Sequence, residues 1–182
     1  MPYVYAVIEN GAGEPAPPLY AVRRGRVAAV VADRGVPEAT PDALIAHEEV
    51  VEALMDPGPV LPMRFGSTTA DVAGLLAERE DELAGALERV RGAVELGVRE
   101  AGGCAPPPAT GTDYLMGRTR LARMHEALAP HARAAVRARR SPHVGAYLVH
   151  RDAVDAFRAR VAGLDAALVC TGPWPPYSFP TP

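Results

Sequence analysis

The chain has 182 residues, of which 48% are hydrophobic and only 5% aromatic, so its core must consist mainly of Ala, Val and Leu. The formal net charge of −3 gives no general attraction to nucleic acid or anionic membranes, although all 19 basic residues are arginine. No apolar run approaches the roughly 20 residues of a membrane-spanning helix, and the start lacks the basic region of a signal peptide. We therefore expect a soluble cytoplasmic protein with no nucleic-acid or membrane partner.

Three short β-rich segments open the chain. Residues 3–8, 19–22 and 26–32 are dominated by Val, Ala and Tyr. Arg23-Arg24-Gly25 joins the last two and has the length and the glycine of a hairpin turn. We expect a strand at each segment, with a hairpin between the second and the third.

A helix should follow these strands. Thr40 is a plausible N-cap, Pro41 suits the first helical position, and Asp42 complements the positive end of the helix dipole. Apolar residues continue on one face of this segment as far as Leu54. The run Asp56-Pro57-Gly58-Pro59 should then end the helix.

A strand, a long helix and another strand are predicted next. Residues 60–65 form a short apolar run, typical of a buried strand. Between residues 68 and 91, apolar side chains repeat at the three- and four-residue steps of an amphipathic helix. Gly92 should end this helix, and residues 93–99 alternate as a strand does.

A glycine- and proline-rich segment separates these elements from the rest. Residues 101–112 contain three glycines and three consecutive prolines, which indicates a linker or an exposed loop. Beyond it we expect a helix over 113–140 that Pro130 kinks or splits, a strand over 143–150, a short helix over 151–162 and a last strand over 166–170.

The order of these elements indicates the fold class. Strands and helices are mixed in both halves, so we predict an α+β protein with two small domains, residues 1–91 and residues 92–182. The second half resembles a ferredoxin-like unit that lacks one strand.

No pattern in the chain indicates catalytic or metal-binding chemistry. Neither GxGxxG nor GxxxxGK[ST] occurs. His125 and His131 lie six residues apart across a proline, which is not the i, i+4 spacing of a helical metal pair. Cys104 and Cys170 lie far apart, as expected of two free thiols in a reducing compartment. We therefore predict no enzymatic activity, no cofactor and no metal.

The segment LPMRFG over residues 61–66 is unusual for a strand that serves packing alone. It contains a proline, and the charged Arg64 stands beside Phe65. One interpretation is an edge strand, where proline is tolerated and Arg64 caps a helix or pairs with a carboxylate. The other interpretation places Arg64 and Phe65 on a partner-binding surface.

Several segments together resemble the gas vesicle protein F/L family (GvpF/GvpL). The two most specific are MRFG and, at residues 172–179, GPWPPYSF. They occur in the family's order, over nearly the whole chain, with YVYAVIE, LYAVRRGRVAAVVA, AHEEVVEALMDPGPVLPMRFGS, VELGVRE, DYLMGR and VGAYLVHRDAVDAFRARV.

The resemblance implies a two-domain α+β protein whose C-terminal domain is a modified ferredoxin-like fold. It also implies an accessory role in gas vesicle nucleation and assembly, through contact with the major shell protein GvpA and other accessory proteins. The protein would then be associated with gas vesicles and have no enzymatic activity. A small-molecule-binding regulatory module of ferredoxin-like type is the alternative, by analogy of fold.

This chain departs from the family between residues 112 and 142. Family members usually carry a longer helical excursion between the DYL segment and the AYLV strand. If the absent helix presents a partner surface, this protein binds fewer or different partners.

The proline-rich tail over residues 171–182 is expected to fold back onto the N-terminal half and to set the orientation of the two halves. Prolines restrict the backbone, which lowers the entropy lost when the tail docks. The aromatic rings then bury apolar area, worth roughly 2–3 kcal/mol each. The alternative is an arm that binds a partner. The residues expected to fasten the tail are Trp174, Pro175, Tyr177 and Phe179.

Overall fold

The computed structural model describes residues 1–102, 109–139, 142–165 and 167–179. The chain divides into two compact units, one formed by Met1–Gly92 with Pro175–Pro182 and the other by Ala93–Trp174. The chain thus leaves the first unit after Gly92 and returns to it at Pro175. Each unit contains one four-stranded sheet and its own helices, which confirms the predicted α+β class.

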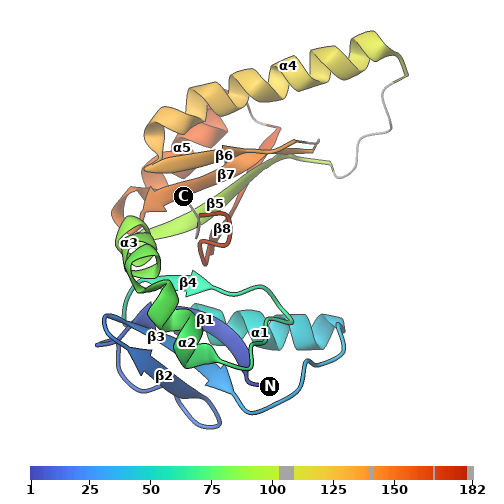
Figure 1. Ribbon diagram of the computed structural model, residues 1–182. Coiled ribbons are helices and arrows are strands. Elements are labelled where there is room, and N and C mark those ends of the chain that lie inside the picture. Colours follow the sequence, from blue (N-terminus) through green and yellow to red (C-terminus); the bar gives the residue numbers. More distant parts are fainter. Residues whose placement is uncertain (103–108, 140–141, 166, 180–182) are drawn as a thin grey trace. The chain divides into compact units, whose positions relative to one another are not determined.

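The sheet of the first unit has the strand order β2-β3-β1-β4, and all neighbours are antiparallel (Figure 1). The predicted β2–β3 hairpin is confirmed, and Gly25 occupies its turn with φ of +49°. A Cβ atom at this glycine would lie 2.2 Å from the Glu80 carboxylate, so any other residue there would displace the end of that side chain. The strands are β1 (Tyr3–Glu9), β2 (Tyr20–Arg24), β3 (Val27–Ala32) and β4 (Val60–Pro62).

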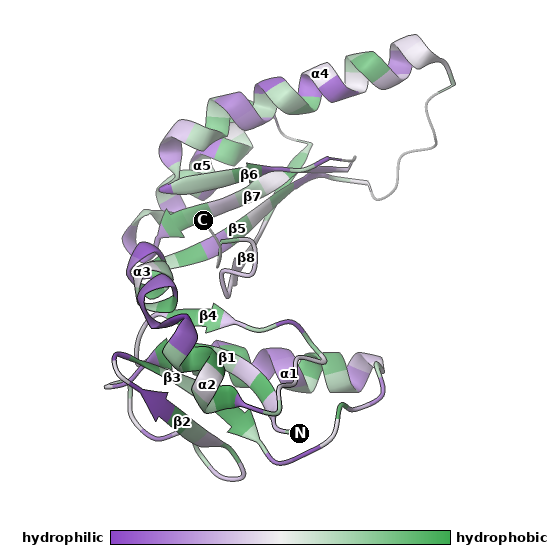
Figure 2. Ribbon diagram, in the orientation of Figure 1, coloured by the Kyte–Doolittle hydropathy of each residue, from purple (hydrophilic) through white to green (hydrophobic). Residues whose placement is uncertain are grey.

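Helices cover both faces of this sheet. Every residue of β3 is buried, and successive strand residues point to opposite faces, so both faces of the sheet are covered along this apolar strand (Figure 2). Tyr3, Tyr5 and Val30 form a core cluster with Val51 of α1 (Pro41–Ala53). The residues buried on α2 (Val72–Glu78) and α3 (Glu80–Val90), which also contact the sheet, are Val72, Leu76, Leu83, Ala86, Leu87 and Val90.

The local helix signals were partly correct. Thr40 caps α1 by accepting a hydrogen bond from the N–H of Ala43 over 3.2 Å, and Pro41 is the first helical residue, as predicted. The single helix predicted over residues 68–91 is wrong, because the chain forms α2 and α3 with a break at Arg79. The apolar periodicity continues across this break, so the pattern alone does not reveal it.

The second unit has the element order β-α-β-β-α-β and the sheet order β6-β7-β5-β8, again antiparallel throughout. Apolar residues of α4 and α5 pack with Leu96, Tyr147 and Val149 of the sheet into one core cluster. The ferredoxin-like description of this unit stays a prediction. Its elements are β5 (Ala93–Glu100), α4 (Gly111–Leu128), a 3-10 turn (Ala129–His131), β6 (Ala134–Arg137), β7 (His143–His150), a 3-10 turn (Arg151–Ala153), α5 (Val154–Leu164) and β8 (Leu168–Trp174).

The helix predicted over residues 113–140 is wrong beyond Leu128. Pro130 lies in the 3-10 turn that ends α4, and residues 134–137 form the edge strand β6. The Ala- and Arg-rich sequence here has good helix propensity, but pairing with β7 outweighs it. This strand is the one that the sequence interpretation lacked.

The remaining structural expectations concern the cysteines and membrane spans. Cys170 is half-buried in β8 and packs against the core of the second unit, and burial raises the pKa of its thiol. Cys104 lies outside the described residues. Within the described ranges, no helix combines the length and the apolarity needed to cross a bilayer.

Candidate functional site

Residues 63–67 follow β4 and are attached to β1 by backbone hydrogen bonds. The N–H of Met63 donates to the carbonyl of Tyr5 over 2.8 Å. The N–H of Val4 donates to the carbonyl of Ser67 over 2.9 Å. These bonds hold both ends of the segment against a buried strand.

Between these two attachments the chain makes a tight turn. Gly66 has φ of +89°, a left-handed conformation that glycine adopts without strain, and the N–H of Ser67 donates to the carbonyl of Arg64 over 3.1 Å. The Arg64 side chain is exposed. The turn therefore presents a guanidinium group to solvent from a backbone that is held in place.

Phe65 has different surroundings from its neighbour Arg64. Its half-buried ring meets Tyr3 and His47 edge-on, with centroid separations of 6.2 and 5.8 Å. Tyr5 stacks on His47 at 5.2 Å, and the guanidinium of Arg34 lies 4.8 Å from the centroid of Tyr3. We call Tyr3, Tyr5, His47 and Phe65 the aromatic cluster. Phe65 anchors the turn to it, and Arg64 is the member of the pair that is open to a partner.

A hydrogen-bond chain determines the protonation state of His47. Its Nε2 lies 3.0 Å from the carbonyl oxygen of Met63, which can only accept, so Nε2 donates. Its Nδ1 lies 2.9 Å from the Tyr3 hydroxyl, which itself accepts from the N–H of Gly66 over 3.2 Å. Because burial lowers its pKa, His47 is neutral at pH 7, and its unprotonated Nδ1 accepts from the Tyr3 hydroxyl. Burial holds the pKa of His47 below its usual 6.5, and the nearby Arg34 acts in the same direction.

The stability of the first unit should therefore fall as the pH is lowered through about 6.5. Below that pH the unfolded chain takes up a proton on His47 that the folded chain resists, so protonation favours unfolding. His47→Gln, which does not titrate, should reduce the loss of melting temperature between neutral and mildly acidic pH. The exposed His143 is the matched control, and His143→Gln should leave the loss unchanged. An equal loss in the His47 variant and the parent would contradict this assignment.

The tail residues occupy different environments. Pro175 and Phe179 are buried, and the Tyr177 hydroxyl donates to the Glu48 carboxylate of α1 over 2.9 Å. Burial raises the pKa of Glu48, and this hydrogen bond opposes the rise. Trp174 closes β8 in the second unit and remains 43% exposed, so it is the least covered of the three rings that were expected to fasten the tail. That the tail sets the orientation of the two units stays a prediction.

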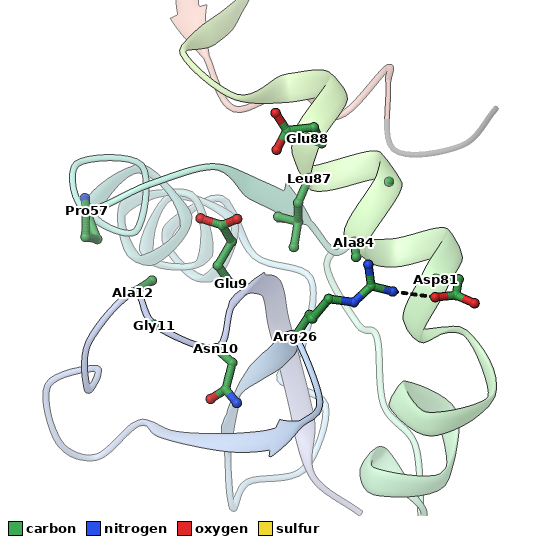
Figure 3. Close-up of a pocket in the computed structure, with 11 residues that line it drawn as sticks. Glu9, Asn10, Gly11, Ala12, Arg26, Pro57, Asp81, Ala84, Leu87 and Glu88 are labelled. Atoms are coloured by element: carbon green, nitrogen blue, oxygen red, sulfur yellow. Dashed lines mark hydrogen bonds and ion pairs between the residues drawn. The ribbon is translucent and has the colours of Figure 1, made fainter.

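A separate pocket of about 780 Å³ opens on the first unit (Figure 3). Its walls are the turn after β1 and one side of α3, where the small residues Ala84 and Gly85 leave room. Nothing in the sequence interpretation indicated it. The lining residues are Glu9, Asn10, Gly11, Ala12, Arg26, Pro57, Asp81, Ala84, Gly85, Leu87 and Glu88.

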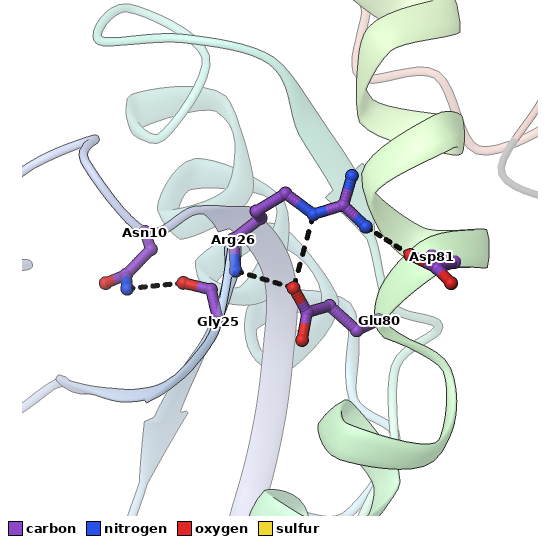
Figure 4. Close-up of polar contacts among 5 residues, drawn as sticks. All are labelled: Asn10, Gly25, Arg26, Glu80 and Asp81. Atoms are coloured by element: carbon purple, nitrogen blue, oxygen red, sulfur yellow. Dashed lines mark hydrogen bonds and ion pairs between the residues drawn. The ribbon is translucent and has the colours of Figure 1, made fainter.

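The charged groups around this pocket are already paired. Arg26 donates from its backbone N–H (3.0 Å) and from Nε (3.2 Å) to Glu80, and its guanidinium also binds Asp81 (Figure 4). These bonds hold the pKa of the Glu80 carboxyl below its usual range. Arg91 bridges Glu9 and Glu88 on the other side. Each of these charged side chains thus already has an ion-pair partner, although the four carboxylates outnumber the two arginines.

The sequence did not indicate His47 or Glu48. The fold brings His47 to Tyr3, and it brings Glu48 to Tyr177 of the tail. The only signal was a histidine between the apolar residues of a predicted helix, and such a residue is usually structural. Among the described residues, no three His, Cys, Asp or Glu side chains come together as metal ligands would. These features define an α+β protein of two units whose candidate site is an arginine presented on a fixed turn.

Comparisons with known proteins show which family shares this sequence. The sequence model of the family described as Gas vesicle synthesis protein GvpL/GvpF matches residues 2–101 and 117–181. Gas vesicle protein F2 of Halobacterium salinarum is 32% identical over 174 residues, covering 88% of this chain and 79% of that protein. Gas vesicle protein L of a Streptomyces species is 31% identical over 182 residues, covering 76% of this chain and 68% of that protein.

Two crystal structures show the same fold. GvpF from Anabaena sp. PCC7120 superposes with a TM-score of 0.69 at 17% identity, covering 100% of this chain and 96% of that one. GvpF from Microcystis aeruginosa superposes with a TM-score of 0.71 at 17% identity, covering 100% and 99%. The chain belongs to the gas vesicle GvpL/GvpF family, and its role is that of a gas vesicle accessory protein. The family match is interrupted at residues 102–116.

Proposed function

We propose that this protein binds the shell protein GvpA, and other accessory proteins, during nucleation and assembly of gas vesicles in the cytoplasm. Family membership supports the process, and the geometry around Arg64 supports the site. The observation that carries the site is an exposed guanidinium on a turn that backbone bonds and Phe65 hold rigid.

A binding role fits the physical demands on a gas vesicle. A shell that keeps water out of a gas space needs subunits with an apolar surface, and such subunits aggregate unless they are covered before assembly. A rigid accessory protein loses little entropy on binding them. Arg64 adds a charged contact that orients the partner.

The protein should act by contact alone. The pocket on the first unit gives the small-molecule alternative no support, since its arginines are bound to neighbouring carboxylates. On the strength of family membership we propose that the protein transforms no substrate.

Co-expression with tagged GvpA tests this function. We expect the chain to co-purify with GvpA and to do so again after Trp174→Ala, which alters an exposed ring outside the proposed site. Purified protein that melts cooperatively but captures neither GvpA nor any other vesicle protein would rule the proposal out.

A further inference from the structure

The first half of α4 is exposed to solvent throughout, although Arg120 at its end pairs with Glu100 and Asp165. All ten residues from 111 to 120 are exposed, whereas Leu121, Met124 and Leu128 in the second half are buried in the core of the second unit. In Figure 1 the amino-terminal half stands clear of the sheet of that unit. An isolated helix of this length is marginal in water, so something further should stabilise it.

This half of the helix exposes three large apolar side chains to solvent. Tyr114, Leu115 and Met116 are consecutive and exposed, and Met116 reaches 67%. Thr110 and Asp113 form a capping box, so the helix has a defined start and is not a frayed end. Because consecutive helical residues point about 100° apart, these three side chains spread around the helix and give this exposed part of α4 an apolar circumference suited to an interaction.

Basic residues accompany these apolar side chains. Arg118 and Arg123 are exposed, and Arg118 lies 5.8 Å from the ring centroid of Tyr114. Arg120 is engaged by Glu100 and Asp165 in its own unit and does not belong to this surface. We call the surface formed by Tyr114, Leu115, Met116, Arg118 and Arg123 the α4 arm.

The first unit carries a surface of opposite charge on α1. Leu44 and Ile45 are exposed, Ile45 to 57%, and Asp42, Glu49 and Glu52 lie exposed around them. Between Arg34 and Arg64 the sequence contains six carboxylates and no arginine. We call the surface formed by Asp42, Leu44, Ile45, Glu49 and Glu52 the α1 face.

The charges of the two units follow the same division. The first unit has 8 arginines and 15 carboxylates, whereas the second has 11 arginines and 7 carboxylates. Unlike units of two copies therefore attract, and like units repel. Pairing two α4 arms would bring arginines together, and pairing two α1 faces would bring carboxylates together.

We propose that this chain associates with a second copy of itself head to tail, the α4 arm of one copy packing on the α1 face of the next. Apolar side chains meet in the middle, and arginines meet carboxylates around them. Each copy offers one surface of each kind, so the contact is heterologous and continues into rings or open chains. The proposal does not depend on shell-protein binding.

Complementation between two variants tests it. The arm variant carries Leu115→Gln and Met116→Gln, and the face variant carries Leu44→Gln and Ile45→Gln, because glutamine keeps good helix propensity. In sedimentation velocity the parent should grow in mass beyond a dimer as its concentration rises, and more weakly at high salt. Each variant alone should weaken association roughly tenfold or more.

An equimolar mixture of the two variants should form a dimer and stop there, because each variant contributes the one surface that the other lacks. Val136→Gln, which alters an exposed apolar residue of β6, should leave association unchanged. A parent that stays monomeric, a face variant that still associates alone, or a mixture that stays monomeric would each overturn the proposal. Circular dichroism of both variants confirms that α1 and α4 are formed.

Discussion

Arg64→Glu is expected to abolish most capture of GvpA while the chain stays folded. The side chain is exposed, so reversing its charge should change stability by no more than about 0.5 kcal/mol. At a binding surface, the same reversal replaces an attraction with a repulsion and leaves the partner's group unpaired, which typically costs about 2 kcal/mol or more. A pulldown from co-expressing cells, with melting curves of the purified proteins, measures both quantities.

Arg24→Glu is the matched control, since Arg24 is an exposed arginine of the same unit at the end of β2. It should retain capture, which would exclude a general effect of net charge. If the Arg64 variant captures GvpA as well as the parent does, Arg64 lies outside the site. If both variants lose capture to the same extent, GvpA binding depends on the net charge of the first unit and not on Arg64 in particular.

Phe179→Ala should destabilise the protein by about 3 kcal/mol, and Trp174→Ala by less than about 1 kcal/mol. Phe179 is only 8% exposed, so its removal leaves a cavity or exposes the apolar surface beneath it. Trp174 is 43% exposed and already keeps much of its contact with water. Thermal and urea unfolding of the two variants should therefore give a loss of several degrees for the first and little change for the second.

Tyr177→Phe separates the hydrogen bond from ring packing in the same tail. It removes the donor to Glu48, whose half-buried carboxylate then lacks that partner, and should cost about 1 kcal/mol. A larger loss from Trp174→Ala than from Phe179→Ala would contradict this ranking and show that the tail is fastened mainly by the tryptophan.

Local chemistry made much of the fold predictable. Strands β1, β2, β3, β5 and β7 were found because their β-rich runs are bounded by turn residues. The start of α1 was found because Thr40 accepts from a free amide at the helix end and Pro41 has no amide N–H that needs a partner. Such signals depend only on neighbours in sequence.

Several features depend on residues distant in the chain, and these were missed. Residues 134–137 have a helical composition but form β6, because pairing with β7 supplies backbone bonds that composition does not report. The neutral state of His47 depends on Tyr3, 44 residues away. The sequence likewise could not show which of the two rings is the more buried, because Trp174 and Phe179 are both aromatic and lie in one short segment.

The sequence by itself determined the α+β class, most of its elements and, through MRFG and GPWPPYSF, the family. The tertiary structure alone decided that Phe65 is an anchor while Arg64 is presented, and that α4 leaves its first ten residues uncovered. The physical reason is that secondary structure and motifs are properties of contiguous residues. Burial, protonation and surface charge are set by residues that only folding brings together.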